Sequence, residues 1–413
     1  MTELSNEMKT ALQLLKRLAQ LLPGIVILLL IYFAILYITC PVYDFNEPVP
    51  FSGNNLYNPY ENMDPGSRRK ANFQVQSKAW LGLTDGRKNT NEEIHRVYES
   101  LGYDVIATSD YQKINRYKSD HPAYIPVYEH GYNIRKVHQV LIGSERVLWR
   151  DYPFLQSIHN KQHIIRLLRP DNDVIVLAHP KFENGYLPEN MKWLSGYDAI
   201  EVLNYFRRSF EHWDSALSSG NYVTIIGNDD VHDIANPDEV GQYMTMINAP
   251  VVDRENVVQA ILSGNTYGVY VYRPVGETMD TKIEKAKRIP VLQGVSLRDD
   301  TLVVSFSDTA SEVVFIGQGG IARASRTHCT EARYTIMPED TYIRTEIHFP
   351  SKMSLYLNPV CRYEGAGPAK IQAPAVNLHK TWILRILGFA TLFFILINVY
   401  AFRRRHKRRK ARR

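Results

Sequence analysis

The chain has 413 residues, which is long enough for two globular domains and further segments, and its content of 45% hydrophobic and 22% charged residues excludes disorder throughout. The formal net charge of +6 is unevenly placed, because nine of the last eleven residues are Lys or Arg. The middle of the chain is net acidic. We therefore expect no basic nucleic-acid surface on the folded part and no nucleic-acid partner.

Two long apolar runs lie near the two ends of the chain, with no charged residue from Leu18 to Tyr43 or from Ile386 to Phe402. At about 1.5 Å per residue, the first run and the second run with its preceding residues are long enough to cross a bilayer. We predict transmembrane helices over residues 21–41 and 382–402. A signal peptide or a buried helix explains one run alone but explains the pair poorly. Lipid attachment at Cys40 is disfavoured, because the preceding YIT lacks small residues.

The flanking charges predict the orientation of these helices. The basic tail, residues 403–413, is expected in the cytoplasm, as is the N-terminal segment, residues 1–20, which carries Lys16 and Arg17 next to the apolar run. Asp44 and Glu47 follow that run on its other side. We predict a bacterial inner-membrane protein with both termini cytoplasmic and its main domains periplasmic or otherwise extracytoplasmic.

The chain has three cysteines, Cys40, Cys329 and Cys361. Export permits a disulfide, and Cys329 with Cys361 is the pair that lies outside the membrane edge. Two free buried thiols are an equally good interpretation, so both remain open.

After the first apolar run, residues 42–70 are rich in Pro, Asn, Tyr and Gly, which predicts an extended or turn-rich linker. We expect folding to begin at Ala71. From there, short apolar runs ending near a Glu, Asp or His alternate with helix-like segments, such as one capped by Thr90 or Asn91 and another from Phe154 to Leu168. This order predicts parallel strands joined by crossovers, with polar strand-end side chains gathered on one face.

A helix pattern at residues 253–264 and the run TYGVYVYR end this region. A charged link, ETMDTKIEKAKR, follows, and residues 290–365 then contain six short alternating strands separated by turn residues. These strands predict a small β-sandwich without a catalytic constellation. Packing, docking and carbohydrate-facing roles for it stay open.

Five motifs carry a resemblance to a known family: TDG with the helix after it, GYDVIATSD, VLAHP, YDAIEVLN and GNDDVH. Together they resemble the PHP (polymerase and histidinol phosphatase) family of metal-dependent phosphoesterases over residues 71–273. The resemblance implies a distorted (β/α)7 barrel of seven strands. The expected fold class is therefore α/β, with a PHP-like barrel followed by a small all-β sandwich at 290–365, flanked by two transmembrane helices.

The resemblance also implies a ligand set for two or three metal ions, of which part is changed in this chain. The matching ligand positions that keep an acid or a histidine are Asp85, Glu129, His138, His179, Asp230 and His232. Family histidines are replaced at three positions, by Gln74, Gln76 and Tyr111. Each retained residue also has a plain structural interpretation, such as a turn-forming role for Asp85.

An amide oxygen is a poor ligand for zinc or iron, so the replacements weaken all but one of the implied sites. Glu129, His138 and His179 form the complete set of three, with a fourth position left for water. We therefore expect one divalent ion, if any, and zinc, manganese or iron are the candidates.

Two functions follow from this partial site. The replaced ligands favour a pseudoenzyme that acts as a binding or scaffold module of an envelope complex, with a protein partner and perhaps one retained metal. The retained ligands favour the alternative, a metal-dependent phosphoric ester hydrolase of unspecified substrate with a reduced site. In that case Asp230 or His232 would be the catalytic proton acceptor.

Overall fold

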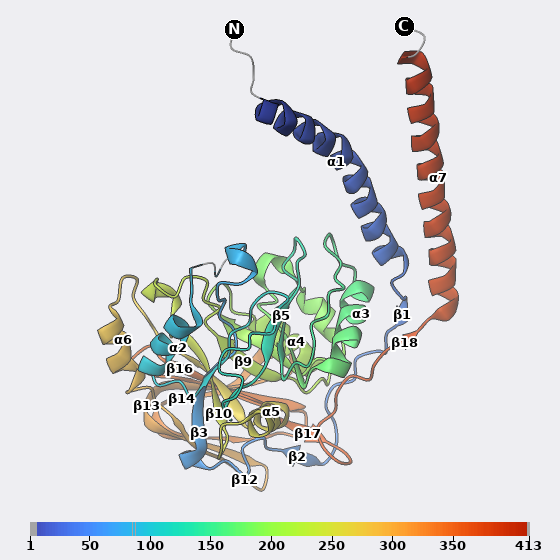
Figure 1. The fold of residues 1–413 in the computed structure, drawn as a ribbon. Coiled ribbons are helices and arrows are strands. Elements are labelled where there is room, and N and C mark those ends of the chain that lie inside the picture. Colours follow the sequence, from blue (N-terminus) through green and yellow to red (C-terminus); the bar gives the residue numbers. More distant parts are fainter. Residues whose placement is uncertain (1–5, 85, 87, 411–413) are drawn as a thin grey trace. The chain divides into compact units, whose positions relative to one another are not determined.

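In the computed structural model of the protein, the structure is described for residues 6–84, 86 and 88–410 (Figure 1). It divides into two units, one formed by Met1–Asp44 with Ala375–Arg413 and the other by Phe45–Pro374.

The first unit contains the two long apolar helices. Helix α1 spans Asn6–Ile38 and helix α7 spans Leu378–Lys410, while the short strands β1 (Tyr43–Asp44) and β18 (Ala375–Val376) pair antiparallel. Arg385 Nη2 donates a hydrogen bond to the backbone oxygen of Thr39 at 2.8 Å. By length and composition, Gln13–Ile38 and Leu378–His406 could each cross a membrane. Residues 6–20 and 403–410, predicted as separate flanking segments, continue these helices.

The second unit contains a five-stranded sheet with the order β5-β6-β7-β8-β9. Its central strands are buried on both faces, which explains their continuous apolar runs. β7, β8 and β9 pair in parallel as predicted, but β5, β6 and β7 pair antiparallel. No crossover helix separates β5 from β6, and so short a connection suits an antiparallel pair. The strands are β5 (Val127–His130), β6 (Gln139–Ile142), β7 (Val174–Leu177), β8 (Ala199–Asn204) and β9 (Thr224–Asn228).

Isolated bridges extend this sheet at both edges. Val75 bridges Val231 beyond β9, and Tyr111 bridges Glu129 of β5, both in parallel. Ser109 donates a backbone hydrogen bond to Val75 at 2.9 Å, which links the two added segments. The sheets assigned among the described residues do not themselves close into a barrel. The seven-stranded barrel therefore stays a prediction, and these bridges are the contacts that favour it.

The remaining core strands form an eleven-stranded sheet in which β16 pairs with β11. The C-terminal strands therefore share one sheet with β3, β4, β10 and β11, which precede residue 290. Phe45–Pro374 is one compact unit, and its division into a barrel and a sandwich stays a prediction. The strands are β2 (Asn55–Tyr57), β3 (Arg68–Asn72), β4 (Val105–Ile106), β10 (Tyr243–Asn248), β11 (Thr266–Tyr270), β12 (Leu292–Arg298), β13 (Thr301–Gly317), β14 (Ile321–Thr335), β15 (Tyr342–His348), β16 (Ser354–Leu357) and β17 (Val360–Tyr363).

Helices α4 and α5 contact the buried strands, α4 at β8 and α5 at β7 and β10. The predicted cap Thr90 is correct, because its side chain accepts from Glu93 N and Glu93 accepts in return. The predicted helix from Phe154 begins four residues later, after its cap Ser157. The helices are α2 (Asn91–Ser100), α3 (Ile158–Leu168), α4 (Phe210–Ser218), α5 (Arg254–Ser263) and α6 (Met279–Ala286).

Two other segments differ from the sequence prediction. The charged link contains α6, whose first turn is capped by the side chain of Thr278. The expected linker is packed rather than free, because Phe51 and Tyr60 are buried and β2 pairs with β17. Cys40, Cys329 and Cys361 are free thiols.

Candidate metal centre and adjoining pocket

Three of the predicted ligands converge at neighbouring strands. Glu129 lies in β5, His138 directly precedes β6, and His179 follows β7 by two residues. One potential ligand atom from each side chain lies within 4.8 Å of the others, and all three residues are buried. His138 Nδ1 is 2.5 Å and His179 Nε2 is 3.4 Å from Glu129 Oε1. Two imidazoles and one carboxylate form a donor set suited to a divalent transition metal.

The hairpin of β5 and β6 positions His138 beside Glu129. Glu129 pairs with Val140 in the antiparallel register, so the chain reverses between them. The His138 ring lies against Gly131, where an added Cβ would be 2.5 Å from His138 Cδ2. Gly131 also has a φ of +128°, which side-chain-bearing residues rarely adopt. A glycine is required there for the ring to approach.

Electrostatics couple the three side chains. Burial by itself would raise the pKa of Glu129, but the two imidazoles beside it hold the pKa below its ordinary value. Burial lowers the pKa of His138, whereas the pKa of His179 is raised to about 9 against the effect of burial, by Glu129 and Asp230. A metal binds the neutral imidazole, so an ion entering the cluster competes with the proton on His179.

Asp230 and His232 follow β9 and border the same cluster. His232 Nδ1 is 2.8 Å from the backbone oxygen of Asp230. Asp230 Oδ2 accepts from Asn204 Nδ2 at 3.1 Å, while its Oδ1 has no hydrogen-bond partner among the described residues. Burial raises the pKa of Asp230. Asp230 and His179 have φ values of +54° and +29°, and such backbone strain is common at functional sites.

The three positions predicted to carry replaced ligands differ in how they contact the cluster. Gln76 Nε2 donates to Glu129 Oε2 at 2.7 Å. The amide of Gln74 is fully buried and has no hydrogen-bond partner among the described residues. Tyr111 lies with its ring 5.6 Å from the ring of His138, and its hydroxyl is 3.5 Å from His232 Nε2. Asp85 lies outside the described residues.

Glu201 of β8 belongs to the site but was missed as a candidate. Its carboxylate accepts from the backbone nitrogen of His179 at 2.8 Å and from the side chains of Asn204 and Asn228 at 3.0 and 2.8 Å. Burial is the main cause that raises its pKa to about 8. Glu201 therefore positions the backbone of His179 and the side-chain amide of Asn204, which also donates to Asp230. The available signal was an acid inside the apolar run AIEVL.

A pocket of about 360 Å³ opens onto this cluster. Its lining combines site residues with aromatic and charged side chains: Tyr111, Lys136, His138, His179, Phe182, Tyr205, Phe206, Asp230, His232 and Glu239. The cluster is therefore reachable by a small ligand, even though its ligand atoms are buried.

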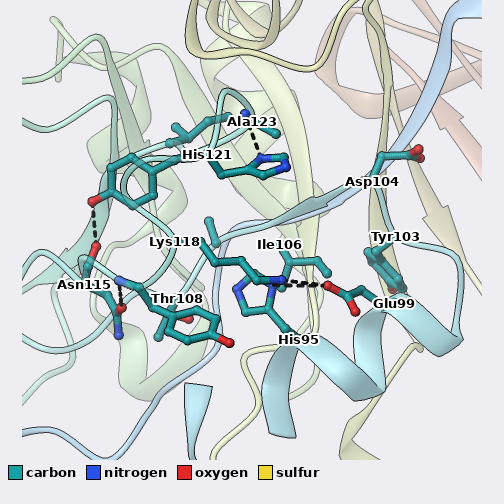
Figure 2. Close-up of a pocket in the computed structure, with 14 residues that line it drawn as sticks. His95, Glu99, Tyr103, Asp104, Ile106, Thr108, Asn115, Lys118, His121 and Ala123 are labelled. Carbon is teal, nitrogen blue, oxygen red and sulfur yellow. Dashed lines mark hydrogen bonds and ion pairs between the residues drawn. The ribbon is translucent and has the colours of Figure 1, made fainter. Parts of the chain in front are cut away.

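A separate hollow of about 160 Å³ lies beside α2 (Figure 2). There Lys118 Nζ is 2.9 Å from Glu99 Oε1 and 3.3 Å from His95 Nδ1. These charged and polar groups contact one another across the hollow, and they do not form a metal-ligand group among the described residues.

Comparisons with known proteins give little beyond this geometry. No protein-family model and no curated protein matches the chain. Among solved structures, a two-domain protein from Bacteroides vulgatus that contains a predicted PHP-like metal-dependent phosphoesterase is similar, at 15% identity and a TM-score of 0.37. The similarity covers 76% of this chain and 100% of that chain. A likeness this distant carries no argument of its own, so the site rests on its geometry.

Proposed function

We propose that this protein is a PHP-like metal-dependent phosphoesterase that binds one divalent ion through Glu129, His138 and His179. The observation that carries the proposal is the convergence of these three ligands at an open pocket. His179 Nδ1 and Asp230 Oδ1 are buried and have no hydrogen-bond partner among the described residues, which fits a site built to receive a further group. Zinc, manganese and iron all suit this donor set.

A divalent ion held there supplies Lewis acidity to a phosphoryl oxygen and lowers the pKa of water. The reaction is hydrolysis, in which one P–O ester bond breaks, water provides the new oxygen on phosphorus, and a proton passes to the leaving alcohol. His232, partly exposed in the pocket, is placed to accept or return a proton, and Tyr111 orients its Nε2. Asp230 is the second candidate proton acceptor. Lys136 in the pocket wall balances phosphate charge.

The same proposal includes the membrane. We infer that α1 and α7 anchor the chain in a bacterial inner membrane, with both termini cytoplasmic and Phe45–Pro374 outside the cytoplasm. The two apolar helices and the basic end of α7 support this arrangement.

A second candidate is the binding or scaffold module of an envelope complex, with one structural ion or none and a protein partner. One observation favours it: the side-chain amide of Gln76 donates a hydrogen bond to one carboxylate oxygen of Glu129. A second ion would have to displace that hydrogen bond to bind the same oxygen. A single ion cannot hold both the attacking and the leaving oxygen of a displacement as two ions do.

The test is the metal content and phosphatase activity of the full chain in detergent. Elemental analysis is expected to find about one transition-metal ion per chain, and loss of a ligand in Glu129→Gln or His179→Ala is expected to weaken its binding by about 100-fold or more. Hydrolysis of p-nitrophenyl phosphate is expected to fall in parallel. The control is His212→Ala, since His212 and His179 are each 2% exposed but the His212 ring, among the described residues, bonds only a backbone oxygen, at 3.0 Å.

The outcomes separate the two candidates. Metal loss confined to the ligand variants, together with lost hydrolysis, supports the enzyme. Metal binding without hydrolysis of monoesters or diesters favours the binding module. A metal-free, well-folded wild-type chain after loading with zinc, manganese and iron would overturn the proposal.

A further inference from the structure

A second hollow, of about 500 Å³, adjoins the pocket of the metal centre. Tyr111, Lys136 and His138 line both, so one ligand can extend from one into the other. The metal centre and the hydrolysis reaction account for the first pocket only. The second contains features that they leave unexplained.

Aromatic side chains stand at the mouth of this second hollow. Trp80 and Trp149 are 42% and 58% exposed, and their rings lie 5.7 Å apart at 72°. The Trp80 indole is held by its Nε1, which donates to the backbone oxygen of Tyr111 at 2.7 Å, while the backbone oxygen of Trp149 accepts from the Tyr132 hydroxyl at 3.0 Å and the Trp149 ring packs against that of Trp80. Exposed indole faces are suited to ring-shaped ligands, and less side-chain entropy is lost on binding where an indole is already held.

Unpartnered polar groups line the same hollow. Gln112 is 6% exposed, and neither atom of its side-chain amide has a hydrogen-bond partner among the described residues. The hydroxyl of Thr84 likewise has none. Gln112 is fixed by its backbone nitrogen, which donates to Glu129 at 2.8 Å, and it has a φ of +51°. Leaving buried polar groups unpaired is energetically costly, so their presence here points to a ligand that pairs with them.

The chemistry of these groups selects among ring-shaped ligands. An amide provides a donor and an acceptor side by side, and a sugar hydroxyl can both donate and accept, so neighbouring hydroxyls pair with Gln112 and Thr84. Two indole rings at 72° form a corner rather than a parallel slot. A puckered pyranose, with C–H groups on its faces and hydroxyls on its edge, fits such a corner better than a planar base does. Lys136 forms no ion pair with a described residue and lies in the shared wall, where it attracts phosphate.

We propose that this hollow, formed around Trp80, Trp149, Gln112 and Thr84, is the sugar subsite of a sugar-phosphate substrate. The proposal rests on the proposed phosphoesterase function and adds its substrate class. The sugar ring occupies the aromatic corner and its phosphate lies beside Lys136, toward the metal centre. The alcohol released by hydrolysis is then the sugar itself.

The test compares ligands that share a phosphate and differ in the rest. Binding of glucose 1-phosphate, N-acetylglucosamine 1-phosphate, AMP and glycerol 1-phosphate to the full chain in detergent is measured by calorimetry. Gln112→Leu, Thr84→Val and Trp149→Ala are each expected to weaken binding of a sugar phosphate by about tenfold or more, with glycerol 1-phosphate unaffected. Trp382→Ala is the control, because Trp382 is also 58% exposed but lies in α7.

Each outcome decides one claim. Tighter binding of AMP that depends on Gln112, or equal binding of sugar phosphates and glycerol 1-phosphate, overturns the sugar subsite. Metal-dependent release of phosphate from glycerol 1-phosphate would in either case leave the proposed enzyme standing. Sugar-phosphate binding that requires Gln112 and Trp149, without hydrolysis of any ester, would instead overturn the enzyme and keep the subsite.

Discussion

Two buried polar clusters of the same compact unit are built in opposite ways. One joins α4 to β15, where Arg344 donates to both carboxylate oxygens of Asp214, at 2.6 and 2.8 Å, and also pairs with Glu346. The guanidinium lies 5.2 Å from the ring of Trp213. These hydrogen bonds and the neighbouring carboxylates raise the pKa of Arg344, even though burial acts in the opposite direction. Its charges are matched within the fold, as structural stability requires.

The other cluster is the candidate metal centre, and its polar groups are only partly matched. Gln74, His179 Nδ1 and Asp230 Oδ1 are buried without hydrogen-bond partners among the described residues. Asp230 also has a left-handed backbone conformation. Burial alone therefore does not distinguish a functional site from a structural one. The difference is whether the buried donors and acceptors find one another, and where they do not, a ligand is expected.

The first prediction tests this contrast by unfolding. Arg344→Met removes the guanidinium that pairs with Asp214 and Glu346 and leaves the Asp214 carboxylate without that cation, so we expect a loss of about 3–5 kcal/mol in the free energy of unfolding. Gln74→Leu removes an amide that bonds to nothing described, so we expect a change within about 1 kcal/mol. Denaturant titration of both variants against the wild type measures the difference. Equal losses in the two variants would show that the contrast between the clusters is mistaken.

The second prediction changes the ligand atoms at the two predicted ligand positions that carry glutamine. Gln74 and Gln76 flank Val75, which bridges Val231; the backbone oxygen of Gln74 accepts from Asp230 N at 3.1 Å, and the Gln76 amide donates to Glu129 at 2.7 Å. We expect Gln74→His combined with Gln76→His to raise the bound transition metal from about one ion to about two per chain, because imidazole replaces a poor amide ligand. Elemental analysis measures the ratio.

The control for this gain is Gln162→His, a buried glutamine of α3 whose amide bonds the backbone of Ser195. It is expected to bind no extra ion. A double variant that folds and still binds one ion would mean that the replaced residues no longer surround a second metal position.

The local parts of this structure could be predicted from sequence, since their signals lie within a few residues. The Thr90 cap with Glu93 is one example. The convergence of Glu129, His138 and His179 was also predicted, because the resemblance to the PHP family implied that the three residues form one ligand set. Periodicity alone could not have placed these residues together.

Non-local pairing was not predictable in the same way. The antiparallel pairing of β16 with β11 depends on contacts between residues far apart in the chain. β14 was largely missed because its sequence, IARASRTHCTEARYT, is polar on both faces, and it pairs only with β13 among the described strands. The Gln112 subsite was missed too, since an unpartnered amide is visible only once its surroundings are known.

The third prediction concerns a buried cation that is less fully paired than Arg344 but, unlike the Gln74 amide of the candidate metal centre, has a hydrogen-bond partner among the described residues. Among the described residues, the Lys161 ammonium in α3 has one hydrogen-bond partner, Asn190 Oδ1 at 2.8 Å, and its Nζ lies 5.2 Å from the Tyr186 ring. Burial lowers its pKa from 10.5 to about 8. Between about pH 8 and 10.5 the folded state therefore binds fewer protons than the unfolded state. The contribution of Lys161 to the free energy of unfolding rises with pH across that window and is lost as the pH falls below it.

Relative to Lys161→Gln, the wild type is accordingly expected to gain up to about 3 kcal/mol of unfolding free energy between pH 7.5 and pH 10. Comparing the two chains cancels the titration of every other group that they share. Lys192→Gln is the control, because Lys192 is 43% exposed and pairs with Glu189 at the surface. A pH-independent difference for Lys161→Gln would mean that Asn190 and Tyr186 hold the ammonium charged, and that Lys161 belongs with the matched cluster of Arg344 instead.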